Sequence, residues 1–200
     1  MDKASLTYAI VKAAVENAGY KFFTGELNIN MIGIRSSKHE VDNWDDFFIL
    51  CWQENGENLV WVNDRYTTDP GIYYMQQQIL SPKGCGILVP GQYRGVWKIG
   101  HHGAAQYEAF VQIGNTVKVY RDRNKDNVMD FDSATIEEGW FGCNQHHGYE
   151  SAHVGNNSAM CQVHQHKKDL DFVLSKAKQN IAAGNGDSFT YTLLTEKDFN

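Results

Sequence analysis

Histidine and cysteine are concentrated in one stretch of this 200-residue chain, residues 142–166. Five of the eight histidines and two of the four cysteines fall within it. Two chemistries use thiol and imidazole together. A cysteine thiolate can attack a carbonyl while a histidine takes its proton and then protonates the leaving group. Alternatively, both side chains can bind zinc.

Cys161 is the residue that we expect to be the nucleophile, with His146, fifteen residues upstream, as general base and then general acid. His147 remains an alternative to His146, because neighbouring residues of a strand point to opposite faces and the sequence does not fix which face is which. The competing interpretation of Cys161 is a buried, unreactive thiol among histidines that lie on the surface.

A zinc site is the second hypothesis for this stretch. Its ligands would come from His146, His153, His164 and His166. If His164 and His166 belong to one strand, both rings lie on the same face, as a metal requires. The corresponding function would be a zinc-dependent peptidoglycan peptidase or amidase.

The order of residues around Cys161 resembles the active-site signature of the L,D-transpeptidase (YkuD-type) domain. The segment Ser158-Ala159-Met160-Cys161-Gln162 follows a histidine that comes after Gly142-Cys143-Asn144. Ala159 and Met160 stand where the family motif has histidine and glycine. Residues 30–35, 88–95 and 119–122 are similar to the single-domain phage or phage-derived relatives of that family.

The resemblance implies a cysteine acyl-enzyme, a β-sandwich or barrel-like fold, and bacterial peptidoglycan stem peptides as substrate. By position it makes Cys161 the nucleophile, His146 the base and Ser158 the residue that orients the imidazole. Backbone N–H groups beside the nucleophile would hold the oxyanion. We also expect His147 and Gln162 to contact the substrate.

Tyr93 and Arg94 form a second group, in a glycine-rich region that continues to Trp97 and 101–102. An arginine beside aromatic side chains suits an acidic stem peptide, so we expect these two residues to bind substrate. The competing interpretation is an ordinary strand with Trp97 in the core.

Oxygen-bearing side chains recur at every second position of a third group and predict a structural Ca²⁺ site. They are Asp122, Asn124, Asp126 and Asp130. Asn127 holds the sixth position, where calcium loops usually have glycine, and Ser133 holds the twelfth, where they usually have glutamate. A solvated hairpin turn is the alternative. No cofactor is expected for the reaction itself.

Periodicity predicts a mainly β fold, as one domain over residues 1–200 with a helix near each end. Apolar residues at helical spacing predict helices over about 3–18 and 168–182. Alternating or continuous apolar runs predict strands at 27–34, 47–52, 59–62, 86–90, 95–99, 108–113, 116–120 and 188–194.

Composition excludes several partners. The net charge is −6 and there is no basic stripe, which argues against nucleic acid. No apolar run approaches the length of about twenty residues needed to span a membrane. The start of the chain lacks a signal-peptide pattern, so we expect synthesis in a host cytoplasm, free thiols, and action at the cell wall after release.

These patterns together predict a cysteine-dependent peptidoglycan peptide hydrolase or transpeptidase of the kind found in phage lysins. Two alternatives remain beside it. One is the zinc enzyme. The other is a non-catalytic wall-binding or virion structural module, which Ala159 and Met160 favour because they depart from the family motif.

Overall fold

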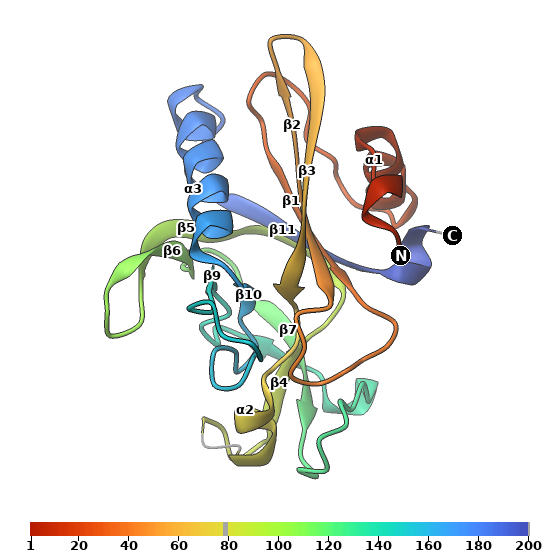
Figure 1. The fold of residues 1–200 in the computed structure, drawn as a ribbon, viewed down its shortest axis with the longest axis vertical. Helices are drawn as coiled ribbons and strands as arrows, with labels where there is room; N and C mark the ends of the chain where they lie inside the picture. The colour runs from red at the N-terminus through yellow and green to blue at the C-terminus, as the bar shows by residue number, and fades with distance from the viewer. Residues whose placement is uncertain (78–79, 200) are drawn as a thin grey trace.

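A closed barrel of eight strands forms the centre of the molecule in the computed structural model, which describes residues 1–77 and 80–199 (Figure 1). The strand order around the barrel is β1-β11-β5-β6-β9-β10-β3-β2. Two neighbouring pairs, β1 with β11 and β9 with β10, run parallel, and the other neighbours run antiparallel. A second sheet has the order β4-β7-β8. The expected mainly β, barrel-like fold is therefore confirmed at this level.

The elements have the following bounds. The strands are β1 (Asn30–Arg35), β2 (Asp46–Glu54), β3 (Glu57–Thr67), β4 (Cys85–Leu88), β5 (Gly91–His102), β6 (Tyr107–Gln112), β7 (Val117–Asp122), β8 (Glu137–Gly139), β9 (Gln145–His147), β10 (Gln162–His164) and β11 (Phe189–Thr195). The helices are α1 (Tyr8–Asn17), α2 (Ile72–Gln77) and α3 (Lys167–Ala182), with 3₁₀ turns η1 (Lys3–Ser5), η2 (Ser133–Thr135) and η3 (Glu196–Phe199).

Helices cover both faces of the barrel wall around β1. Helix α1 packs Val11 and Val15 against the outer side, where Ile32 and Ile49 lie. Helix α3 packs its apolar face into the main core, in the same cluster as Phe48. Every residue of β1 is consequently buried, which explains why this strand loses the polar–apolar alternation of a half-exposed strand.

The smaller sheet lies at the other end of the molecule from α3, together with α2 (Figure 1). It has its own apolar cluster, in which Met75 of α2 packs with Cys85 and Ile87 of β4 and with Met129. No helix in the described part of the chain is long and apolar enough to cross a membrane.

The predicted helix 3–18 is wrong at its start. Thr7 has extended backbone and its hydroxyl accepts a hydrogen bond from the N–H of Ile10, so the α-helix begins at Tyr8 and residues 3–5 form a separate turn. The predicted helix 168–182 agrees with α3 to within one residue. Helix α2 and strands β8, β9 and β10 have no counterpart among the predicted elements.

Candidate functional site

Strands β9 and β10 lie side by side in parallel and carry the residues of the histidine- and cysteine-rich stretch. Gln162 pairs with Gln145, Val163 with His146, and His164 with His147. The inner face of this pair is polar but fully buried. The side-chain amide of Gln145 lies 2.9 Å from His164 Nε2, and Gln162 accepts a hydrogen bond from Tyr191 at 2.8 Å.

The outer face of the same pair carries Cys161 and His146. Side chains alternate along a strand, so Cys161 shares the face of Val163, and Val163 pairs with His146. The N–H of Gln162 donates to the carbonyl of Asn144, which sets Cys161 opposite Asn144 and diagonal to His146. Strand spacing and rise place such diagonal neighbours roughly 8 Å apart at Cβ. No hydrogen bond joins Cys161 to His146, both of which the structure describes, and the thiol lies instead against the carbonyl of Gly142, two residues before Asn144.

Two neighbours fix the orientation of the His146 ring. Its Nδ1 lies 2.9 Å from the carbonyl oxygen of His147, to which a protonated Nδ1 donates. His102 stacks on the ring with centroids 4.1 Å apart and an angle of 14°. Asn144 in turn holds His102, with Nδ2 3.0 Å from the His102 Nδ1. With the proton on Nδ1, the Nε2 lone pair of His146 is left as the basic atom.

His147 belongs to the other face of β9. Its ring packs against Tyr107 and Tyr149, with centroids 4.3 and 4.5 Å away. Its Nδ1 accepts a hydrogen bond from the N–H of Tyr149. Strand alternation therefore turns His147 away from Cys161 and favours His146 as the base.

Burial controls the charge state of both groups. Cys161 is only partly exposed, and desolvation raises the pKa of its thiol to about 11, against a small lowering by the Asn144 backbone N–H. Desolvation lowers the pKa of His146 to about 3, with His102 lowering it further. The resting pair is therefore a neutral thiol and a neutral imidazole. The thiol donates weakly to the carbonyl of Gly142, with the sulfur 3.6 Å from the oxygen.

The loop before Cys161 is held by hydrogen bonds to its carbonyl groups. Ser158 donates its hydroxyl to the Cys161 carbonyl at 2.9 Å, and the N–H of Gly71 donates to the Ser158 carbonyl at 2.8 Å. The thiols of Cys85 and Cys143 lie 3.5 Å from the carbonyl oxygens of Ala159 and Met160 respectively. Ser158 thus restrains the backbone of Cys161, whereas the resemblance led us to expect it at the imidazole of His146.

The backbone N–H groups of Met160 and Cys161 make no hydrogen bond to any residue that the structure describes. The Met160 side chain is 8% exposed, packs in the main core and lines a pocket. Neither N–H group is thus engaged by another described residue, which an oxyanion-binding role at this position would require.

Three residues expected to bind substrate lie elsewhere. The Gln162 side chain is inside the barrel, where its Nε2 donates to the Met160 carbonyl at 3.1 Å, because its strand position faces the core. Arg94 stacks on Phe23, with its guanidinium carbon 5.1 Å from the ring centroid. Tyr93 donates to the Val89 carbonyl at 2.5 Å. Arg94 and Tyr93 line a depression whose lining includes neither Cys161 nor any residue of the loop before it.

The histidines of the zinc hypothesis are not brought together. His164 is inside the barrel beside Asn63, and His166 is at the start of α3, paired with Glu150. His153 is mostly exposed near Asp42. His164 and His166 do not share a strand face, because β10 ends at His164.

The predicted calcium loop is a turn in which side-chain oxygens accept backbone N–H groups. Asn124 accepts from the N–H of Asp126, and Asp126 accepts from that of Val128. Asn127 has the left-handed conformation, with φ at 65°, that the sixth position of a calcium loop requires. No group of three or more His, Cys, Asp or Glu side chains suited to a metal ion occurs in the described residues. Calcium binding stays a prediction.

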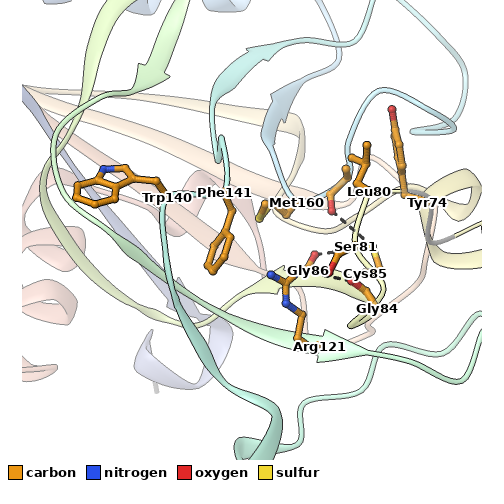
Figure 2. A pocket seen from close by; sticks show the side chains of 11 residues that line it. Tyr74, Leu80, Ser81, Gly84, Cys85, Gly86, Arg121, Trp140, Phe141 and Met160 are labelled. Atoms are coloured by element: carbon orange, nitrogen blue, oxygen red, sulfur yellow. Dashed lines mark hydrogen bonds between the residues drawn. The ribbon is translucent and has the colours of Figure 1, made fainter.

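A pocket of about 350 Å³ opens beside the loop that carries Cys161 (Figure 2). Tyr74, Arg121, Trp140, Phe141 and Met160 contribute to its lining. Sequence patterns gave no sign of this pocket, because its residues come from four separate segments of the chain.

Known proteins give no further guide. No protein-family model, curated protein or solved structure matches this chain. The resemblance to the L,D-transpeptidase family therefore rests only on the sequence segments named above, those around Cys161 and residues 30–35, 88–95 and 119–122. Sequence reasoning also missed two residues that support His146. His102 and Asn144 are separated by 42 positions, and only the pairing of β6 with both β5 and β9 brings them together.

Proposed function

We propose that the protein is a cysteine-dependent hydrolase or transpeptidase of peptidoglycan stem peptides. The observation that carries this proposal is the shared outer face of β9 and β10, on which Cys161 and His146 are diagonal neighbours. The His147 carbonyl holds the His146 tautomer whose free Nε2 can accept a proton. The motif resemblance suggests peptidoglycan as the substrate. It also suggests that the protein is a phage lysin, which acts at the cell wall after release.

The proposed reaction proceeds through an acyl-enzyme. His146 takes the thiol proton as the Cys161 sulfur attacks the amide carbonyl carbon, and a C–S bond forms. The N–H groups of Met160 and Cys161 donate to the resulting oxyanion. When the C–N bond breaks, the imidazolium gives its proton to the leaving amine. Water then hydrolyses the thioester, or the amine of a second peptide takes the acyl group.

Cys161→Ala tests the nucleophile. Purified wild-type protein is expected to convert muropeptides to smaller or exchanged products, and Cys161→Ala is expected to lose turnover by at least 10²-fold, since no acyl-enzyme can form. Product masses measured over time provide the readout. Cys51→Ala, at a buried thiol in the α1-facing core, controls for the loss of any cysteine. Equal turnover by wild type and Cys161→Ala would contradict the proposal.

Two further arms separate the alternatives. His146→Ala is expected to lower kcat by about 10²–10⁴-fold, the usual contribution of a general base, while His147→Phe retains most of it. Turnover that disappears on dialysis against a strong chelator and returns with zinc would instead identify a metal enzyme. Retention on peptidoglycan without any product from wild-type protein would identify a binding module.

A further inference from the structure

The pocket adjoins the loop that leads into Cys161, although Cys161 itself is not one of the residues that line it. Ala159 and Met160 line it and directly precede the nucleophile. Tyr74 lines it from α2, and burial raises the pKa of its hydroxyl, with a smaller contribution from the Cys161 thiol. A peptide bound at Cys161 can therefore extend into this pocket.

Arg121 provides the cation in the pocket. It lies on β7 with a side chain only 7% exposed, and its guanidinium stacks on Phe141 with the central carbon 4.7 Å from the ring centroid. Figure 2 shows the Phe141 ring and the Arg121 guanidinium side by side, with Met160 close to both. Nε pairs with Glu137 at 3.0 Å and Nη1 donates to the Gly84 carbonyl at 3.4 Å. Nη2 makes no hydrogen bond to a described residue.

Arg121 shares its ion-pair partner with a lysine. Glu137 is shared, because Lys83 also pairs with it at 2.5 Å. Two cations thus face one carboxylate. Asp122, the next residue of β7, belongs to the opposite face of its sheet by strand alternation. A guanidinium that is mostly buried and only partly compensated favours an anionic ligand, and its planar fork matches a carboxylate.

Gly86 keeps the floor of the pocket open. It pairs with Arg121 across β4 and β7. A Cβ at this position would lie 3.1 Å from the Met160 sulfur and 3.5 Å from Arg121 Nη1. Any larger side chain would therefore occupy the space between the arginine and the nucleophile loop.

We propose that this pocket binds a free carboxylate of the substrate peptide, through Arg121, next to the bond that Cys161 attacks. The proposal rests on the proposed function and adds a substrate class to it: peptides with a free carboxylate close to the scissile amide. A volume of about 350 Å³ is near the lower limit for small-molecule sites and suits one or two residues of a peptide. Trp140 and Tyr74 offer aromatic surface for the rest of that segment.

Binding to the full chain with Cys161→Ala tests the subsite without turnover. The probes are a synthetic stem tetrapeptide with free carboxylates and the same peptide with every carboxylate amidated. Isothermal titration is expected to give at least tenfold weaker binding for the amide. In the Cys161→Ala background, Arg121→Gln should weaken binding of the acid at least tenfold and leave binding of the amide unchanged. Arg121→Lys should recover part of the loss.

Two other variants sharpen the assignment. Glu137→Gln removes the carboxylate that competes for Arg121 and Lys83, so it should tighten binding of the acid several-fold. Arg65→Gln removes an exposed arginine outside the pocket and should change nothing. Thermal unfolding of each variant verifies that it folds. If Arg121→Gln does not fold, Arg121→Lys takes its place in the comparison with the parent protein.

The outcomes separate the subsite from the catalytic proposal. Equal affinity for the acid and the amide peptide would overturn the subsite. Weaker binding of the acid in Arg94→Gln, with unchanged binding in Arg121→Gln, would overturn it as well. Cys161-dependent turnover without any carboxylate preference leaves the proposed function intact and removes the subsite. A carboxylate preference that depends on Arg121, in a wild-type protein that turns nothing over, supports the subsite and removes the proposed function.

Discussion

Burial at the β9–β10 pair affects the thiol and the imidazole in opposite directions. It raises the pKa of Cys161 to about 11 and lowers that of His146 to about 3. The two values, 11 − 3, lie about eight units apart in the direction that opposes proton transfer in the resting protein. A thiolate–imidazolium pair therefore does not form before substrate binds. Charge develops only during attack, when the oxyanion and its N–H donors are also in place.

Alkylation of Cys161 measures this resting state. At pH 8 a pKa two units above the ordinary value of 9.0 lowers the thiolate fraction about 100-fold. A more basic thiolate is also a stronger nucleophile, which recovers roughly tenfold of this loss in rate. Iodoacetamide is expected to modify Cys161 about tenfold more slowly than an exposed thiol, with a rate that rises until about pH 11. Peptide mass mapping assigns the site, and urea-unfolded protein is the control. A rate that stays constant down to pH 6 would instead reveal an ion pair.

At the scale of the elements, the hydrophobic pattern of the sequence predicts those barrel strands whose buried residues are apolar. It misses the strands whose buried residues are polar. The run 47–52 is apolar because both sides of β2 are buried, and it identifies the strand. Strands β9 and β10 contain Gln145, Gln162 and His164, which are equally buried but polar. Their burial depends on hydrogen bonds to partners far along the chain, such as Tyr191, and no local pattern encodes those partners.

The same limit applies to the candidate site. Residue type and spacing in the sequence are enough to single out Cys161 and His146 as candidates. The carboxylate-binding residue could not be predicted in this way, because Arg94 and Arg121 look alike in sequence. Only the packing of β7 against β4 places one of them beside the loop of the nucleophile.

Gly71, just before α2, fixes the position of that loop. Its N–H holds the Ser158 carbonyl, and a Cβ on it would lie 2.0 Å from the Gly155 carbonyl oxygen. Gly71→Ala is expected to displace residues 155–158, to destabilise the fold by about 1–3 kcal/mol, and to reduce turnover. Urea unfolding and the muropeptide assay measure both effects.

Gly91→Ala is the matched control for this substitution, because its Cβ would meet nothing closer than 3.8 Å. Loss of stability and turnover in both variants alike would show that the contact between Gly71 and the loop has no special role.

At the scale of the whole molecule, buried neutral histidines make the fold sensitive to acid. Desolvation lowers the pKa of His164 to about 3, as it does that of His146. The unfolded chain binds protons at these positions below about pH 6.5, whereas the folded chain binds them only near pH 3. The free energy of unfolding therefore falls as pH decreases through this window. Asp46 acts in the opposite direction, because burial raises its pKa.

Comparison of wild type with His164→Gln isolates the histidine contribution. Between pH 6 and pH 4 the wild type is expected to lose roughly 1.4 kcal/mol of unfolding free energy per pH unit more than the variant does. Urea unfolding at several pH values gives the slopes. His101→Gln, at an exposed position on β5, is expected to keep the wild-type slope. Parallel slopes for wild type and His164→Gln would contradict the buried neutral state.

The alternation of Cys161 and Gln162 has a consequence for folding. These consecutive residues face opposite sides of the wall, one toward the proposed substrate and the other toward Tyr191 inside the barrel. A slip of β10 by one residue against β9 would exchange them, placing the thiol in the core and the amide outside. A misaligned but compact chain would then be inactive. Turnover regained after dilution from denaturant would therefore report the fidelity of strand alignment, which compactness alone does not reveal.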